Sequence, residues 1–338
     1  MADDALKTLF HPFDAGSLEP QRQEDRVLFL GAAPGFRLPQ GWAAPVRAVQ
    51  GFRPDFLALE RSGLTVTPRP EEEGYDVALI LADRHRGQNE LRIAEAVGRT
   101  KEGGLIVVAG AKDDGIASLR KRLAGLLGIE GALPKYHGLA FWFRREGGAG
   151  EAALALRAAN PALLVENRFH TLPGMFSHDR VDAGSRLLVE NLPADLSGAV
   201  ADFCAGWGFV AAEVAARCPA VSALDLYEAD FEALEAAKLN LAATPQRKEF
   251  FWTDLLAEPV ERRYDTVVMN PPFHKGHAAD PGIGAGMIHA AAKALKPGGR
   301  LVMVANRQLP YEAVLKTCFA SSGEVARDSG FKVLSARR

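Results

Sequence analysis

The stretch YDTVVMNPPF, residues 264–273, constrains the fold of this chain more than any other part of the sequence. Residues 266–269 form a short apolar run rich in β-branched side chains, which is typical of a strand buried in a parallel sheet. The run stops abruptly at NPPF, residues 270–273. Each proline lacks a backbone N–H and restricts the residue before it, so the sequence predicts that this strand ends in a stiff turn.

The turn offers hydrogen-bond acceptors and few donors. Pro271 and Pro272 remove two N–H groups, which leaves the Asn270 side-chain oxygen and backbone carbonyls, with Phe273 as an aromatic face beside them. Such a site suits a flat group that bears an NH2, because two acceptors take its two hydrogens while the ring stacks on Phe273. The structural alternative is a rigid turn with a core Phe, since prolines are frequent in turns.

Length and composition exclude several classes of protein. The chain has 338 residues, 48% of them hydrophobic, and a formal net charge of −2, which indicates one or two ordinary globular domains. No apolar run approaches the roughly 20 residues that span a bilayer. The three cysteines are widely spaced and support neither a disulfide framework nor a cysteine-based metal site. We therefore expect a cytoplasmic protein with no membrane segment and no metal.

Strand and helix patterns alternate along the second half of the chain. This alternation predicts an α/β fold whose mostly parallel sheet carries helices on both faces. A tight turn at Ser329-Gly330 joins the last two strands, so the sheet should include an antiparallel closing strand. The run Gly282-x-Gly284-x-Gly286 follows no strand, and we expect it to form a flexible lip over a substrate rather than a phosphate loop.

The first half of the chain repeats the order of sequence motifs found in the second half. Tyr75-Asp76 and Tyr264-Asp265 each open a strand, and Gly103-Gly104 and Gly298-Gly299 each precede one. The shared order predicts two related domains.

We expect these domains at residues 1–148 and 166–338, with a linker and helix at 149–165 between them. Where the second copy has NPP, the first has Ala82-Asp83-Arg84. The first domain should therefore keep the scaffold and lack the chemical site.

A second motif, DFCAGWG at residues 202–208, breaks a strand into a glycine-rich turn ahead of a helix. Read as GxGxxA, residues 206–211 fit a dinucleotide-binding fingerprint, with Asp225 near the next strand end for ribose hydroxyls. A nicotinamide-dependent dehydrogenase is thus an alternative. Asp202 argues against it, because a carboxylate there would repel a pyrophosphate but suits the amino group of a methionine moiety.

Together the two motifs resemble those of class I S-adenosylmethionine-dependent methyltransferases that modify exocyclic or amide nitrogens. The resemblance implies that S-adenosylmethionine is the cofactor. Asp202 and the glycine turn would hold its methionine end and Asp225 its ribose, while Asp254 would reach the adenine amino group. Cys204 replaces the first glycine of the family pattern, which we expect to weaken cofactor binding. The cofactor residues implied are Asp202, Cys204, Ala205, Gly206, Gly208, Asp225, Leu226, Asp254, Leu255 and Asn270.

The C-terminal part carries a narrower resemblance. The segments LPGMFS (172–177), DAGS (182–185), VANRQLPY (304–311) and GFKV (330–333) are similar to those of bacterial ribosomal RNA guanine-N2 methyltransferases, the RsmC/RlmG group. This implies two tandem Rossmann-like class I methyltransferase domains. The N-terminal one is degenerate and serves RNA binding or support, and the C-terminal one has a mostly parallel seven-stranded sheet with an antiparallel closing strand.

The same resemblance implies methyl transfer to the N2 amine of a guanine in ribosomal RNA of the small subunit. Asn270, Pro271, Pro272 and Phe273 would form the catalytic turn. Ribosomal RNA or a ribosomal subunit would be the partner, and the protein a monomer or weak dimer. Three alternatives stay open: methylation of a protein glutamine at N5, methylation of adenine at N6, and a non-catalytic RNA-binding protein.

Overall fold

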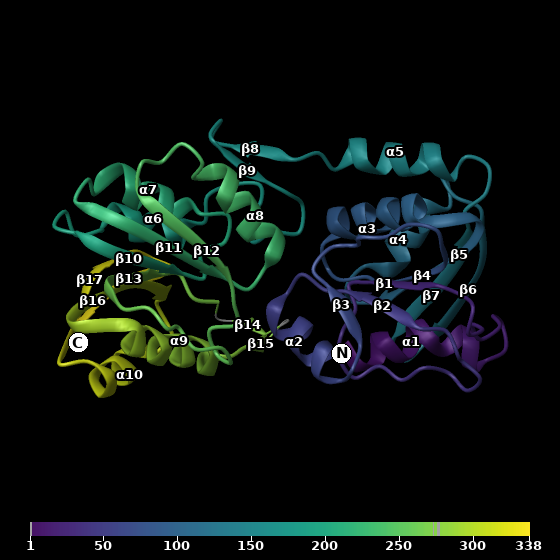
Figure 1. Cartoon of the computed structure of the whole chain (residues 1–338), viewed down its shortest axis with the longest axis horizontal. Coiled ribbons are helices and arrows are strands. Elements are labelled where there is room, and N and C mark those ends of the chain that lie inside the picture. The colour runs from purple at the N-terminus through teal and green to yellow at the C-terminus, as the bar shows by residue number, and fades with distance from the viewer. Residues whose placement is uncertain (1, 273, 276–277) are drawn as a thin grey trace. The chain divides into compact units, whose positions relative to one another are not determined.

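The computed structural model describes residues 2–272, 274–275 and 278–338, and the chain divides into two compact units at residues 161 and 162 (Figure 1). The helix predicted within the 149–165 segment is α5 (Ala149–Ala159), and it packs on α3 (Arg86–Arg99) inside the first unit. Arg157 of α5 pairs with Glu95 of α3 at 2.8 Å. The helix of the predicted linker segment thus packs within the first unit. The domain limits at residues 148 and 166 stay a prediction.

The second unit is organised around a seven-stranded sheet in the order β12-β11-β10-β13-β16-β18-β17. Strands β12 to β16 in this order are mutually parallel, and β18 runs antiparallel to both of its neighbours, which confirms the expected closing strand. The strands are β10 (Gly198–Phe203), β11 (Val221–Glu228), β12 (Arg247–Trp252), β13 (Tyr264–Met269), β16 (Leu295–Asn306), β17 (Ser321–Arg327) and β18 (Phe331–Arg337).

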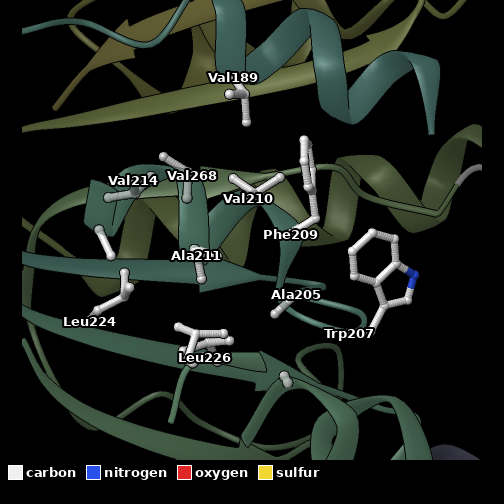
Figure 2. Packing of buried hydrophobic residues seen from close by; sticks show 14 of the residues in the cluster. Val189, Ala205, Trp207, Phe209, Val210, Ala211, Val214, Leu224, Leu226 and Val268 are labelled. Atoms are coloured by element: carbon white, nitrogen blue, oxygen red, sulfur yellow. The ribbon is translucent and has the colours of Figure 1, made fainter. Parts of the chain in front are cut away.

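Helices cover both faces of this sheet, because strand side chains alternate between two apolar cores. One core joins the sheet to α6 (Ala183–Glu190), α7 (Phe209–Arg217) and α8 (Phe231–Asn240), and Figure 2 shows its side chains close up. The other joins it to α9 (Pro281–Ala294) and α10 (Tyr311–Cys318). Small two-stranded sheets complete the unit: β8 (Leu163–Val165) with β9 (Phe169–Thr171), and β14 (His274–Lys275) with β15 (Ala278–Ala279).

The first unit repeats the same strand path. Its sheet runs β3-β2-β1-β4-β5-β7-β6, which is the order of the second sheet when each is counted along its own chain. The predicted duplication is thereby confirmed. The strands are β1 (Val27–Leu30), β2 (Val46–Val49), β3 (Thr65–Thr67), β4 (Tyr75–Leu81), β5 (Thr100–Ala111), β6 (Ile129–Lys135) and β7 (Gly138–Arg144), and the further helices are α1 (Ala2–Asp14), α2 (Arg53–Arg61) and α4 (Ile116–Leu123).

The glycine run 282–286 is not a flexible lip, as the sequence predicted, but the first turns of α9. A Cβ on Gly284 would lie 2.0 Å from the Tyr311 hydroxyl oxygen, and one on Gly286 would lie 2.5 Å from Leu256 Cδ2. These glycines therefore serve close helix packing, which alternating glycines in a sequence do not distinguish from a loop.

In the first unit, an arginine lies against the start of the turn that corresponds to the glycine turn. Gly31 follows β1, and a Cβ there would lie 3.1 Å from the Arg92 guanidinium carbon. Arg92 donates to the Leu81 carbonyl at 3.2 Å and to Asp83 at 2.9 Å, so its side chain is anchored at the carboxyl ends of β1 and β4.

Candidate active site

The candidate site lies where β10 and β13 end side by side in the second unit. The two strands are parallel, and Phe203 pairs with Met269, so residues 204 and 270 leave the sheet at the same edge. The chain continues to β11 on one side of this pair and to β16 on the other, so the strand order reverses between β10 and β13. In open α/β sheets, ligands bind in the crevice at such a switch point.

The turn after β10 has three residues in the left-handed region, namely Cys204 (φ 59°), Gly206 (φ 53°) and Gly208 (φ 86°). A Cβ on Gly208 would lie 2.6 Å from Leu241 Cδ1 and 3.0 Å from Ala237 Cβ, so this glycine lets the turn pack on α8. Around a Cβ on Gly206, by contrast, no described atom lies within 4 Å. The backbone at Gly206 is therefore open to a ligand.

Asp202 is a buried carboxylate beneath this turn, with 1% of its surface exposed. Its Oδ2 atom has no hydrogen-bond partner among the described residues. Burial raises the pKa of Asp202 well above its ordinary value, and the nearby Glu228 raises it further. An unpaired buried acceptor is costly, so this atom suits a ligand that donates to it.

Glu228, the last residue of β11, lies beside the glycine turn and is a further candidate that the sequence did not indicate. Its Oε2 accepts from the Gly206 N–H at 2.7 Å, and its Oε1 accepts from Ala229 and Asp230 N–H at 2.8 and 2.9 Å. Burial raises the pKa of Glu228 to about 7, although these backbone donors oppose the shift. Its carboxylate thus lies directly against the open glycine.

Asp225, which the sequence analysis placed near the strand end, lies in the interior of β11, three residues before Glu228. It is 1% exposed, and its Oδ2 accepts from Arg262 at 2.8 Å and from the Tyr264 hydroxyl at 2.9 Å. The strand-end position was therefore wrong, because the strand continues through Leu226 and Tyr227. Leu226 is fully buried in the core with α7 and α8.

The remaining predicted cofactor residues are divided between the core and the sheet edge. Ala205 and Leu255 are buried, at 8% and 7% exposure. Asp254 follows β12 by two residues and is half-buried, with its Oδ1 accepting from Leu256 N–H at 3.0 Å. Asp254 therefore lies at the edge where β12 ends, two strands from β10.

Asn270 follows β13 directly and is held by the start of α6. Its Nδ2 donates to Asp182 Oδ2 at 3.0 Å and to Ser185 Oγ at 2.8 Å. Pro271 is buried and Pro272 is exposed, while Phe273 lies outside the described residues. Both of these bonds are made by the amide nitrogen, and among the residues that the structure describes none donates to the Asn270 oxygen.

The segment between β9 and α6 presents an aromatic ring near the glycine turn. Phe176 is 64% exposed, and its carbonyl accepts from Trp207 Nε1 at 3.0 Å. Figure 2 shows Trp207 in this turn, beside the core residues Ala205 and Phe209. An exposed ring on a segment tied to the turn is a further candidate contact, which the sequence motif LPGMFS does not single out.

The described residues contain no group of three or more His, Cys, Asp or Glu that could hold a metal ion. Within the same residues, no helix has the length and apolar character needed to cross a membrane.

We expect Cys204→Gly to tighten cofactor binding severalfold. A residue other than glycine in the left-handed region costs about 1–2 kcal/mol, and a glycine would let the turn adjust to the cofactor without that cost. The Cys204 thiol lies near the carboxyl groups of Asp202 and Glu228. Calorimetric titration with S-adenosylmethionine measures the affinity. Cys204→Ala keeps the backbone strain and removes the thiol, so it separates the effect of the strained backbone on affinity from the effect of the thiol. Weaker binding by the glycine variant would contradict this role of Cys204.

Comparisons with known proteins bear on both units. The family described as the methyltransferase small domain matches residues 166–335. Ribosomal RNA small subunit methyltransferase C of Pseudomonas aeruginosa (strain LESB58) is 34% identical over 265 residues, covering 77% of this chain and 79% of that protein. The protein of the same name from Citrobacter koseri is 37% identical over 163 residues, which cover 48% of this chain and 47% of the Citrobacter protein.

A solved structure shares the fold of almost the whole chain. It is the T. thermophilus 16S rRNA N2 G1207 methyltransferase in complex with AdoMet and guanosine, with a TM-score of 0.77 and 24% identity. The likeness covers 97% of this chain and 91% of the other. The arrangement of two sheets of the same order in one chain is therefore common to both proteins.

Proposed function

This chain belongs to the ribosomal RNA small subunit methyltransferase C family, and from that premise we propose that it transfers a methyl group from S-adenosylmethionine to the N2 amine of a guanine in small-subunit ribosomal RNA. The observation that carries the proposal is the Asn270 amide, anchored through its nitrogen at the edge where the glycine turn begins. The substrate amine is the one named for the T. thermophilus protein of the same fold.

The groups at this sheet edge would suit S-adenosylmethionine. We propose that the methionine amino group of the cofactor donates to the unpaired Asp202 oxygen. The methionine carbon chain would lie against the backbone at Gly206. Glu228, rather than Asp225, would accept from the ribose hydroxyls, because it ends β11 and faces Gly206. Asp254 stays the candidate for the adenine amino group. When bound, the cofactor supplies an electrophilic methyl group on a positively charged sulfur.

Asn270 would act on the nucleophile. The lone pair of a guanine amine is delocalised into the ring, so the amine is a poor nucleophile. Hydrogen bonds from its two N–H groups to Asn270 Oδ1 and the Pro271 carbonyl would localise the lone pair on nitrogen. These bonds strengthen as positive charge develops there, so they stabilise the transition state more than the ground state. Phe273 would stack on the base, which must first leave its duplex.

The first unit would support RNA binding rather than catalysis. Arg92 lies against the start of its counterpart of the glycine turn, and Ala82-Asp83-Arg84 stands where the second unit has NPP. A ribosomal RNA substrate would also place the protein in the cytoplasm, where ribosomal subunits are assembled.

Tritiated S-adenosylmethionine and small subunits from a strain lacking this gene test the proposal. We expect label in the RNA, and nucleoside analysis should identify it as N2-methylguanosine. Label in 6-methyladenosine or in protein glutamine would replace the substrate proposed here. Absence of label, together with no cofactor binding by calorimetry, would indicate a non-catalytic RNA-binding protein instead.

A further inference from the structure

We infer that Asp182 and Ser185 are positioning residues that fix the orientation of the Asn270 amide, and that they thereby make the site selective for bases that present an amine. This inference rests on the proposed function. Both residues belong to the start of α6: Asp182 caps the helix, and its Oδ2 accepts from Ser185 N–H at 2.8 Å. The same carboxylate oxygen accepts from Asn270 Nδ2 at 3.0 Å, and Ser185 Oγ does so at 2.8 Å.

The orientation follows from the chemistry of the two partners. Asp182 Oδ2 accepts from the Ser185 N–H and therefore acts as an acceptor, so the group of Asn270 that faces it must be the amide nitrogen. Turning the amide over would bring Asn270 Oδ1 to about the same 3.0 Å from Asp182 Oδ2, with two acceptors in contact and the bond to Asp182 lost. The Ser185 hydroxyl can donate as well as accept, so it holds the amide in place while Asp182 sets its direction. Asn270 must therefore direct its oxygen away from α6.

An amide fixed in this way distinguishes donors from acceptors on the substrate. Its oxygen accepts from an exocyclic NH2, whereas a keto oxygen at the same place would be repelled. Guanine and hypoxanthine differ only in the 2-amino group, so the second base lacks the donor that Asn270 requires. With a free amide, the side chain could turn its nitrogen to the substrate, and this discrimination would fall.

The start of α6 is itself held by the last strand. A Cβ on Gly184 would lie 3.0 Å from two ring carbons of Phe331, the first residue of β18, and 3.1 Å from Asp182 Oδ2. Leu188 and Val189 of the same helix are buried in the core. The DAGS and GFKV segments, which lie far apart in the sequence, thus meet at one place and secure the two residues that orient Asn270.

The test compares binding of two RNA fragments that carry guanosine or inosine at the mapped target position. We expect the wild-type protein to prefer guanosine by about tenfold or more, since hydrogen bonds contribute about 0.5–1.5 kcal/mol each. In Asp182→Ser/Ser185→Ala, serine still caps α6 but no longer reaches Asn270. The preference should then fall below about threefold, and kcat should fall about tenfold to a hundredfold, with cofactor affinity unchanged.

Two further variants control the test. Asp182→Asn can place its amide oxygen where Oδ2 lies, so it should keep most of the preference. Asp265→Ser removes a carboxylate at the opposite end of β13, where it binds Ala199 N–H and Lys296, and it should lower stability without changing the preference. A folded double variant with wild-type preference and rate would overturn the inference. A wild-type protein that labels guanine in the small subunit but has no preference for guanosine would overturn it as well, whereas absence of label would refute the proposed function itself.

Discussion

Asn270→Ala is expected to lower the rate of methyl transfer about 10²–10³-fold, the usual cost of removing one preorganised contact to developing charge. The variant loses an oxygen that we place on the substrate amine and keeps the glycine turn and Glu228, so cofactor affinity should change little. Single-turnover transfer from tritiated S-adenosylmethionine to small subunits measures the chemical step, and calorimetry measures the cofactor affinity.

A change in stability must be separated from the change in rate. Asn270→Ala also removes the two hydrogen bonds to α6, which contribute about 0.5–1.5 kcal/mol each. Asn160→Ala in the first unit is a matched control, because its amide also bonds a carboxylate, that of Glu90, and a second acceptor, the Leu156 carbonyl. It should lose stability and retain the rate. An Asn270→Ala variant that transfers methyl at the wild-type rate would show that this amide has no part in the chemistry.

The two α/β sheets of this chain could be predicted from the sequence because they depend on repeated local patterns. Buried parallel strands such as residues 266–269 are continuous apolar runs. The turn residues that separate these runs occur in the same order in both halves of the chain. The short elements of the first unit escaped detection: β2, α2 and β3 span only four, nine and three residues. Elements of this length carry too few residues to show a period, and their position is set by the neighbouring strands.

The site was predicted less completely, for a related reason. Residues 225–228 read DLYE, and every one of them is compatible with a strand, so the sequence does not fix where β11 ends. An available signal was Asp230, which caps α8 and therefore requires the strand to end just before it. The link between Asp182 and Asn270 joins residues 88 positions apart, and no local pattern indicates such a contact. Periodicity in the sequence indicates the fold, whereas the site depends on contacts between segments that are distant in the sequence.

The affinity for an adenosine ligand is expected to rise about tenfold between pH 6 and pH 8, because of Glu228. Its pKa is about 7 in the free protein, and ribose hydroxyls that donate to it favour the ionised form, so the pKa falls on binding. Binding then releases a proton, and affinity falls as pH decreases below 7. The free protein shows the opposite trend, since a carboxyl whose pKa is raised on folding contributes stability at low pH that is lost as pH rises to about 7.

The ligand for this measurement is 5′-methylthioadenosine, which has the ribose hydroxyls but no methionine amino group. It therefore leaves Asp202 without its expected partner and removes a titrating group from the ligand. Asp202, Cys204 and Asp230 are ionisable neighbours of Glu228. All three are retained in the Glu228→Gln variant, so a pH dependence that is lost in this variant is due to Glu228. This variant should bind more weakly at pH 8, by about tenfold or more, with no change down to pH 6. An affinity of the wild-type protein that does not vary with pH would place the ribose away from Glu228 and return Asp225 to consideration.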